Sequence, residues 1–315
     1  MRKILGVLAL SSSLAATGCA SFKTIAQATA DKSKVEDEIE ITSSDSDGHS
    51  SGKGQFPHWA TMKKPPARVA LVALYVESPP VKSGSTSNVL TEAGTKKIAN
   101  NLKNKSVAAM KANFKAQGME LLTPEEFLTD ATKKEFFNDF ELKVEGAASA
   151  LNGILGMGDN ITVQQTGLFA GSAPADGYKS FEKFHALYKF ASVSNSVGYD
   201  LAKGIGVDAV LVMVTEVPSD GDHAYLKETN LYMFGPNPIK LADDDLGGFT
   251  DGRKGHLYAA AATDKSYFKN VLVTPPDDDG IDGINDEKNY AGYDVIADVM
   301  SKKIAVYVHD KATGK

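Results

Sequence analysis

The acidic side chains of residues 274–289, TPPDDDGIDGINDEKN, are the strongest candidates for chemistry in this sequence. Carboxylate oxygens gathered in a turning loop are the ligands that Ca²⁺ prefers, and Gly280 and Gly283 permit a sharp turn. The spacing is not that of an EF-hand: with Gly283 as the sixth position, the twelfth is Asn289 and not a bidentate Glu. We expect weak Ca²⁺ binding, with a plain solvated acidic loop as the alternative. The expected ligands are Asp277, Asp279, Asp282 and Asp286.

The sequence lacks the motifs of two common enzyme classes in a usable context. The G-x-S-x-G match at 48–52, GHSSG, lies in a polar segment and not between a strand and a helix, as a nucleophile elbow requires, and there is no H-E-x-x-H motif. The 6 histidines are scattered singly, and a metal-assisted enzyme would need His223 or His256 beside the acidic loop. The glycine-rich residues 153–160 have neither a strand before them nor a helix after them, as a phosphate-binding loop requires. We therefore expect a protein that is not an enzyme, without catalytic residues and with no cofactor other than Ca²⁺.

The single cysteine, Cys19, excludes an intramolecular disulfide and a cysteine-based zinc or iron–sulfur site. It follows a basic start, an apolar run over 4–10 and several small residues, a pattern typical of a secretory signal peptide. The apolar run is much shorter than the roughly 20 residues that span a bilayer.

The residues Ala16-Thr17-Gly18-Cys19 resemble the bacterial lipobox. This resemblance implies that residues 1–18 are a lipoprotein signal peptide and that Cys19 carries acyl chains, palmitate among them. Because Ala20 is not Asp, it also implies an outer-membrane anchor, with the protein facing the periplasm or the cell surface. The alternative is a cysteine placed by chance in an ordinary signal peptide or short anchor.

The charge balance limits the partners. A formal net charge of -6 provides no basic field for phosphates, so we do not expect nucleic-acid binding. An acidic protein is also repelled by anionic lipids. Attachment to a membrane is therefore expected to depend on the acyl chains of Cys19.

Composition divides the mature chain into a tether and a folded part. Residues 19–57 are rich in small and charged residues and poor in large apolar ones, which predicts a flexible tether. Residues 58–315 are expected to form a single α/β domain. A glycine- and alanine-rich segment at about 145–180 is interpreted as an insert in this domain.

Hydrophobic patterning predicts a strand buried on both faces at 67–76 and a helix from Thr91 to Gly118. A short strand at 119–122 should lead into a second helix, which begins with the capping box Thr123-Pro124-Glu125-Glu126.

The second half of the chain is predicted to begin with helical spacing over 181–201 that stops at Gly204, followed by a second buried strand at 207–217. Antiparallel strands should follow, and then a final helix. The predicted fold is thus α/β (α+β), with a β-α-β-α-β start, a mixed sheet, and a C-terminal helix packed on it. The apolar face of that helix is expected to comprise Ile296, Met300, Ile304 and Tyr307.

Three segments, together with Cys19, resemble periplasmic α/β lipoproteins related to the curli secretion channel CsgG and the TolB amino-terminal domain. They are 68–74 (RVALVAL), 119–127 (MELLTPEEF) and 201–217 (LAKGIGVDAVLVMVTEV). The resemblance implies that the strand beginning near Asp208 and Ala209 enters the sheet. It carries over no catalytic residue.

These observations favour a non-enzymatic binding or scaffolding subunit of an envelope assembly or secretion system. Its partners would be envelope proteins, including other copies of this chain, contacted through a sheet edge or the 145–180 insert. The alternatives are a metal-assisted envelope enzyme and a secretion-pore subunit. A pore requires alternating membrane strands, and residues 152–169 alternate poorly.

Overall fold

The structure of the protein is a computed structural model. It describes residues 22–42, 62–79, 90–143, 171–181, 184–219, 223–238, 254–263, 266–268, 270–274 and 280–315. Residues 1–21, which include the predicted signal peptide and Cys19, lie outside these ranges, as do residues 43–61 and 144–170. No helix within them is both long enough and apolar enough to cross a membrane.

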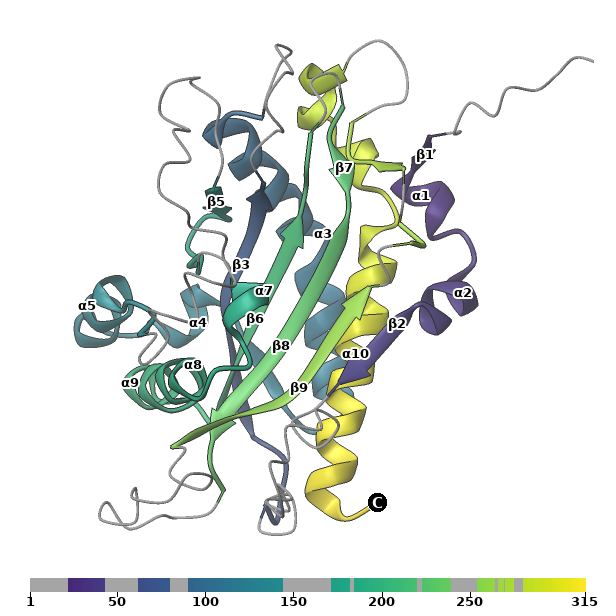
Figure 1. Ribbon diagram of the computed structural model, residues 1–315. Helices are drawn as coiled ribbons and strands as arrows, with labels where there is room; N and C mark the ends of the chain where they lie inside the picture. The colour runs from purple at the N-terminus through teal and green to yellow at the C-terminus, as the bar shows by residue number, and fades with distance from the viewer. Residues whose placement is uncertain are drawn as a thin grey trace, which may run out of the picture.

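A mixed sheet of 7 strands forms the centre of the fold, in the order β2-β9-β8-β6-β3-β4 with β5 paired to β3 (Figure 1). Strand β3 runs parallel to β4 and β6, and the other pairings are antiparallel. The mixed α/β fold expected from the sequence is confirmed. The strands are β2 (Ile39–Thr42), β3 (Arg68–Ser78), β4 (Glu120–Leu122), β5 (Gly171–Pro174), β6 (Ala209–Glu216), β8 (Glu228–Pro236) and β9 (Gly255–Thr263).

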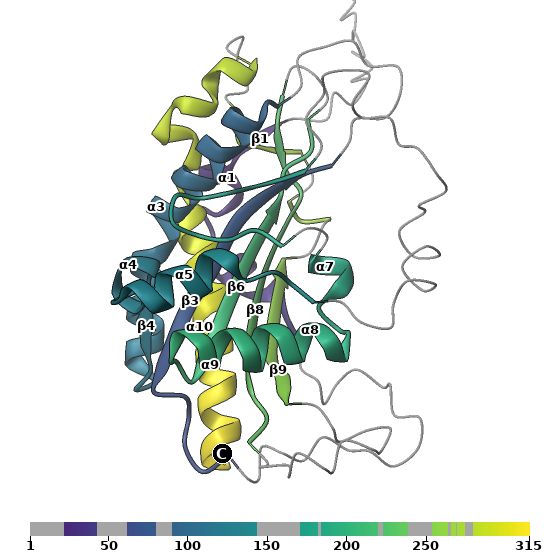
Figure 2. The same ribbon diagram turned by 90° about the vertical axis from the view of Figure 1, so that its left-hand side faces the viewer.

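Helices cover both faces of this sheet, so that Figure 2 shows three layers. One face is covered by α3 (Glu92–Ala116) and α10 (Tyr293–Thr313). The other is covered by α4, α5 and the run α7–α8–η3–α9. These shorter helices are α4 (Pro124–Phe127), α5 (Ala131–Asp139), α7 (Phe184–Leu187), α8 (Ala191–Asn195), the π-helix η3 (Ser196–Leu201) and α9 (Ala202–Ile205).

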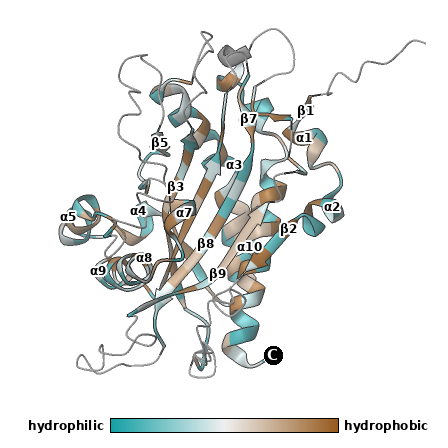
Figure 3. Ribbon diagram, in the orientation of Figure 1, coloured by the Kyte–Doolittle hydropathy of each residue, from teal (hydrophilic) through white to brown (hydrophobic). Residues whose placement is uncertain are grey.

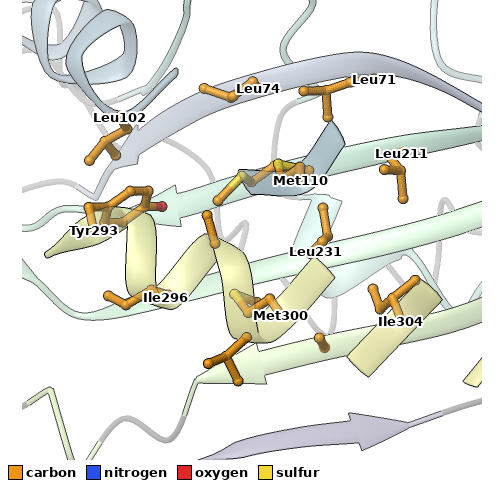
Figure 4. Packing of buried hydrophobic residues seen from close by; sticks show 14 of the residues in the cluster. Leu71, Leu74, Leu102, Met110, Leu211, Leu231, Tyr293, Ile296, Met300 and Ile304 are labelled. Atoms are coloured by element: carbon orange, nitrogen blue, oxygen red, sulfur yellow. The ribbon is translucent and has the colours of Figure 1, made fainter. Parts of the chain in front are cut away.

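The core is built from the two central strands and the helices that cover them. Every residue of β3 after Arg68 is buried, as a strand covered on both faces requires. Figure 4 shows Leu231 of the sheet near the face of α10 that carries Ile296, Met300 and Ile304, whereas Leu71 lies nearer to Met110 of α3. The predicted helix face is therefore confirmed, with Tyr307 packed at its margin. In Figure 3 the central strands are mostly hydrophobic, whereas hydrophilic residues are frequent in α2 and α5.

The predicted helix start at Thr123–Glu126 is confirmed, whereas the predicted stop at Gly204 is wrong. The helix at Pro124 does begin with Glu126 bonded back to the Thr123 amide at 2.8 Å, but it is a single turn, and Asp130 caps a separate helix. The later helix continues through Gly204 and ends at Gly206, whose φ of 74° gives the left-handed C-cap. Gly204 has a packing role instead, since a Cβ there would lie 2.0 Å from the ring of Phe136.

The predicted tether is wrong for residues 22–42. Strand β1 (Lys23–Thr24) pairs with β10 (Val271–Leu272), which also pairs with β7 (Tyr225–Leu226) in a small second sheet. After α1 (Ile25–Ala28) and α2 (Lys32–Asp37), strand β2 extends the main sheet beside β9. The segment is polar in composition, but its few apolar residues are well placed: Ile25, Val35 and Ile39 are 0, 0 and 2% exposed.

Polar contacts tie the same segment to α10. Lys303 Nζ donates to the backbone oxygens of Glu36 and, at 2.7 Å, of Ile39. Lys32 forms an ion pair with Asp298. Residues 22–42, which we call the N-terminal strap, are thus part of the folded structure.

The end of the predicted insert also belongs to the sheet. Strand β5 pairs antiparallel with the carboxyl half of β3, with Ala173 opposite Val76. Lys179 continues the contact through its amide, which donates to the Val72 oxygen at 3.0 Å. The insert prediction is therefore wrong for residues 171–180.

Replacing Gly292 with Ala tests the strap. Gly292 precedes α10 with a φ of 89°, and a Cβ there would lie 2.2 Å from Thr29 Oγ1 of the strap. Strain and clash together should lower the free energy of unfolding by about 2–4 kcal/mol, measured by urea denaturation, and should increase proteolysis within 22–42.

Gly118→Ala is the matched control, because Gly118 has a φ of 71° but nothing within 4 Å of its Cβ position. It should lose only about 1–2 kcal/mol. Equal losses in the two variants, with an unchanged cleavage pattern, would contradict the packing of the strap against Gly292.

Candidate functional site

Three glutamates form a row across neighbouring strands where β3 and β6 reach their carboxyl ends. Glu77 of β3 lies opposite Glu216 of β6, which lies opposite Glu228 of β8. Residues opposite one another in a sheet project to the same face. In open α/β sheets, ligands bind outside the carboxyl ends of the parallel strands.

A β-bulge decides which face Glu77 occupies. Between Leu71 and Ala73 the register with β6 shifts by one residue, and Val72 is extra. Before the bulge, Val69 and Leu71 pack toward α3 and α10; after it, Leu74 and Val76 do so. The bulge therefore turns Glu77 to the opposite face, toward α7.

Helix α7 places His185 against Glu77. The imidazole Nδ1 lies 2.8 Å from Glu77 Oε2. The Glu77 side chain is 12% exposed and that of His185 is 45% exposed, so the carboxylate is enclosed while the ring reaches solvent. We call this the His185–Glu77 pair.

The other carboxylate oxygen, Glu77 Oε1, is buried and accepts no hydrogen bond from the part of the chain that the structure describes. Buried polar atoms in native proteins are almost always bonded, so each exception needs a physical explanation. A donor supplied by a ligand is one such explanation, because Oε1 lies beside a ring that solvent can reach.

The surrounding charges favour the imidazolium form of His185. Its hydrogen bond to Glu77 raises the pKa of the imidazole above 6.5, partial burial opposes this, and the negative charges of Glu77, Glu216 and Glu228 raise it further. Glu216 is itself neutralised in part by Lys227, whose Nζ lies 2.5 Å from its carboxylate.

The chemical capacity of the pair follows from this geometry. A carboxylate at Nδ1 fixes the ring orientation and leaves Nε2 for any further hydrogen bond or ligand. The buried tyrosines beneath it, Tyr75 and Tyr232, stay neutral because burial raises the pKa of each phenol well above its usual value. The arrangement can therefore bind a polar group at the exposed ring of His185, whereas contact with the buried Glu77 Oε1 would require neighbouring side chains to move.

The predicted calcium ligands are only partly within the described residues. Asp286 caps the 3₁₀ turn η5 (Glu287–Tyr290), and its bonds to Lys288, including an ion pair of 2.9 Å, lower the pKa of its carboxyl. Asp282 lies in η4 (Gly280–Asn285), with its side chain outside the described part. Asp277 and Asp279 lie outside it altogether. The Ca²⁺ site stays a prediction, and among the described side chains no group of 3 or more His, Cys, Asp or Glu could hold a metal ion.

The two histidines considered for a metal-assisted enzyme lie at opposite ends of β8. His223 precedes β7 at the end near Glu228, whereas His256 is opposite Gly235. The acidic loop leads into Tyr293, whose hydroxyl lies 2.7 Å from Thr215 at the Glu228 end. Six strand positions, about 20 Å, separate Thr229, which is opposite Thr215, from Gly235, which is opposite His256. Asp277 and Asp279 lie outside the described residues, so the metal-assisted enzyme stays an alternative from the sequence.

The sequence gives no local sign of the His185–Glu77 pair, because 108 residues separate its members. The available signal was weaker: Glu77 and Glu216 are the charged residues that end the two continuous apolar runs. Their meeting with His185 depends on the parallel pairing of β3 with β6 and on the bulge in β3.

Comparison of the chain with protein families, curated proteins and solved structures finds no match. The resemblance to the lipoproteins related to CsgG and TolB thus stays a prediction from the sequence.

The His185–Glu77 pair predicts a pH dependence. A raised pKa of His185 means that the pair stabilises the fold fully below the unfolded value of about 6.5, and that this contribution is lost as the pH rises through the raised value. In an NMR titration, His185 should titrate above 6.5, and Glu77→Gln should lower its pKa and reduce the pH dependence of stability.

Glu228→Gln is the control, because Glu228 acts on His185 only through its charge. It should lower the pKa of His185 less than Glu77→Gln does. A titration of His185 that neither substitution changes would refute the pair as the cause.

Proposed function

We propose that this protein is a lipoprotein of the outer membrane, anchored through acyl chains on Cys19, that acts as a non-enzymatic binding or scaffolding subunit of an envelope assembly or secretion system. The lipobox-like residues before Cys19 support the anchor. The binding role is supported by the site at the carboxyl ends of β3 and β6.

The observation that carries the binding role is the buried Glu77 Oε1 beside the half-exposed ring of His185. A buried acceptor left without a donor costs about 1–3 kcal/mol. A partner group that enters beside His185 after a local side-chain movement, and donates to Glu77 Oε1, would recover this energy on binding. An amine, a guanidinium or an amide of an envelope partner has the required chemistry.

The edges of the main sheet are less suited to the contact. The outer strands β2 and β4 have 4 and 3 residues, and short edge strands are poor templates for strand addition. We therefore place the partner at the His185–Glu77 pair.

Substituting Cys19 with Ser tests the anchor. A protein without acyl chains should leave the membrane fraction and appear in the soluble envelope fraction, because the acyl chains supply the attachment. Fractionation and mass spectrometry of the mature N-terminus are the measurements. An unchanged membrane fraction for Cys19→Ser would contradict the lipobox interpretation.

Crosslinking in whole cells tests the binding role. Proteins that are captured by the native chain should be lost or strongly reduced with Glu77→Gln and with His185→Ala. His309→Ala is the matched control, since His309 also contacts a carboxylate, Asp310 at 3.0 Å, but near the end of α10. Equal capture by all four proteins would place the partner elsewhere.

A further inference from the structure

We propose that the end of the small sheet, around Phe22, docks on the bilayer surface and holds the protein against the membrane in one orientation. This inference rests on the proposed acylation of Cys19. The docking surface consists of Phe22, Lys23, His223 and Tyr225, and we call it the aromatic end.

The length of chain between anchor and fold is the first argument. Phe22 is the third residue after Cys19, and a trans peptide chain advances at most about 3.6 Å per residue. The acylated cysteine would therefore lie within about 11 Å of Phe22. Once the strap is part of the fold, no long tether separates the first sheet from the lipid.

The side chains of the aromatic end are the second argument. Phe22 is 43% exposed, and among the described residues it is the large hydrophobic side chain that lies exposed at the surface. Its ring stacks on His223 with centroids 5.4 Å apart and lies 6.1 Å from the ring of Tyr225. Aromatic rings are favoured at the interface between lipid and water, where an exposed Lys can extend its amine toward the headgroups.

Phe22 is also held in place. Directly after it, Lys23 and Thr24 pair in parallel register with Val271 and Leu272, and the Lys23 amide donates to the Asn270 oxygen at 3.0 Å. Ile25 then inserts fully into the core. The exposed ring is therefore a rigid projection from the fold, so its contact with lipid would fix the orientation of the protein.

The bilayer is favoured over a protein partner because the anchor brings it there by covalent linkage. A protein bound to Phe22 would have to fit into the short space between the aromatic end and the lipid that holds Cys19. Figure 1 shows β1 and the C-terminus of α10 at opposite ends of the molecule. The orientation then directs the end of α10 away from the membrane.

Depth-dependent quenching of tryptophan fluorescence tests this orientation in the full-length, acylated protein. The single native Trp59 is replaced by Phe, and a new tryptophan is introduced by Phe22→Trp or, as the control, by Tyr307→Trp near the end of α10. Each protein is placed in vesicles of phosphatidylethanolamine and phosphatidylglycerol, with and without lipids that carry a spin label near the headgroup. Circular dichroism melting confirms that each variant is folded.

We expect quenching of Phe22→Trp to exceed that of Tyr307→Trp several-fold. If the acylated protein binds vesicles but both tryptophans show the same weak quenching, the docking is overturned and the proposed anchor at Cys19 still stands. Protection of Phe22→Trp from a soluble quencher without quenching by spin-labelled lipid would also overturn it, because the occupant would then be a protein. Chain that carries no acyl group and does not float with vesicles would overturn both the docking and the proposed anchor.

Discussion

The parallel pairing of β3 with β6 is the interaction on which the rest of this structure depends. Both strands are apolar on both faces, and almost every residue of the pair is buried. Burial of apolar surface gives roughly 25 cal/mol per Å², and two apolar faces can be buried only if each receives its own layer. The helices α3 and α10 on one side and α7 to α9 on the other meet this requirement.

The same pairing creates the polar site. Where β3 and β6 leave the core, the apolar residues are followed by Glu77 and Glu216, which lie opposite one another. The bulge in β3 turns Glu77 toward α7. His185 then shields the carboxylate that the sheet could not otherwise tolerate in a nearly buried position. The polar site, with its buried Glu77 oxygen and half-exposed His185 ring, therefore forms where the two apolar strands end.

The N-terminal strap shows how few residues can decide whether a polar segment folds. Ile25, Val35 and Ile39 pack into the core. Lys303 donates hydrogen bonds to backbone carbonyl oxygens of the strap, which would otherwise have to bond to water. The strap both extends the main sheet and brings its own first residues to the small sheet. An anchor at Cys19 would therefore be coupled directly to the fold, which a flexible tether would not achieve.

Local interactions made much of this fold readable from the sequence alone. The apolar runs at 67–76 and 207–217, the helical period before Gly118, and the bond from Glu126 back to the Thr123 amide depend on neighbours within a few residues. Tertiary structure alone decided the strap, the β5 pairing and the His185–Glu77 pair. The average composition of the strap is polar, so it does not show that Ile25, Val35 and Ile39 are buried against distant parts of the chain. A bulge of one residue reverses the face of Glu77 without leaving a pattern in the sequence.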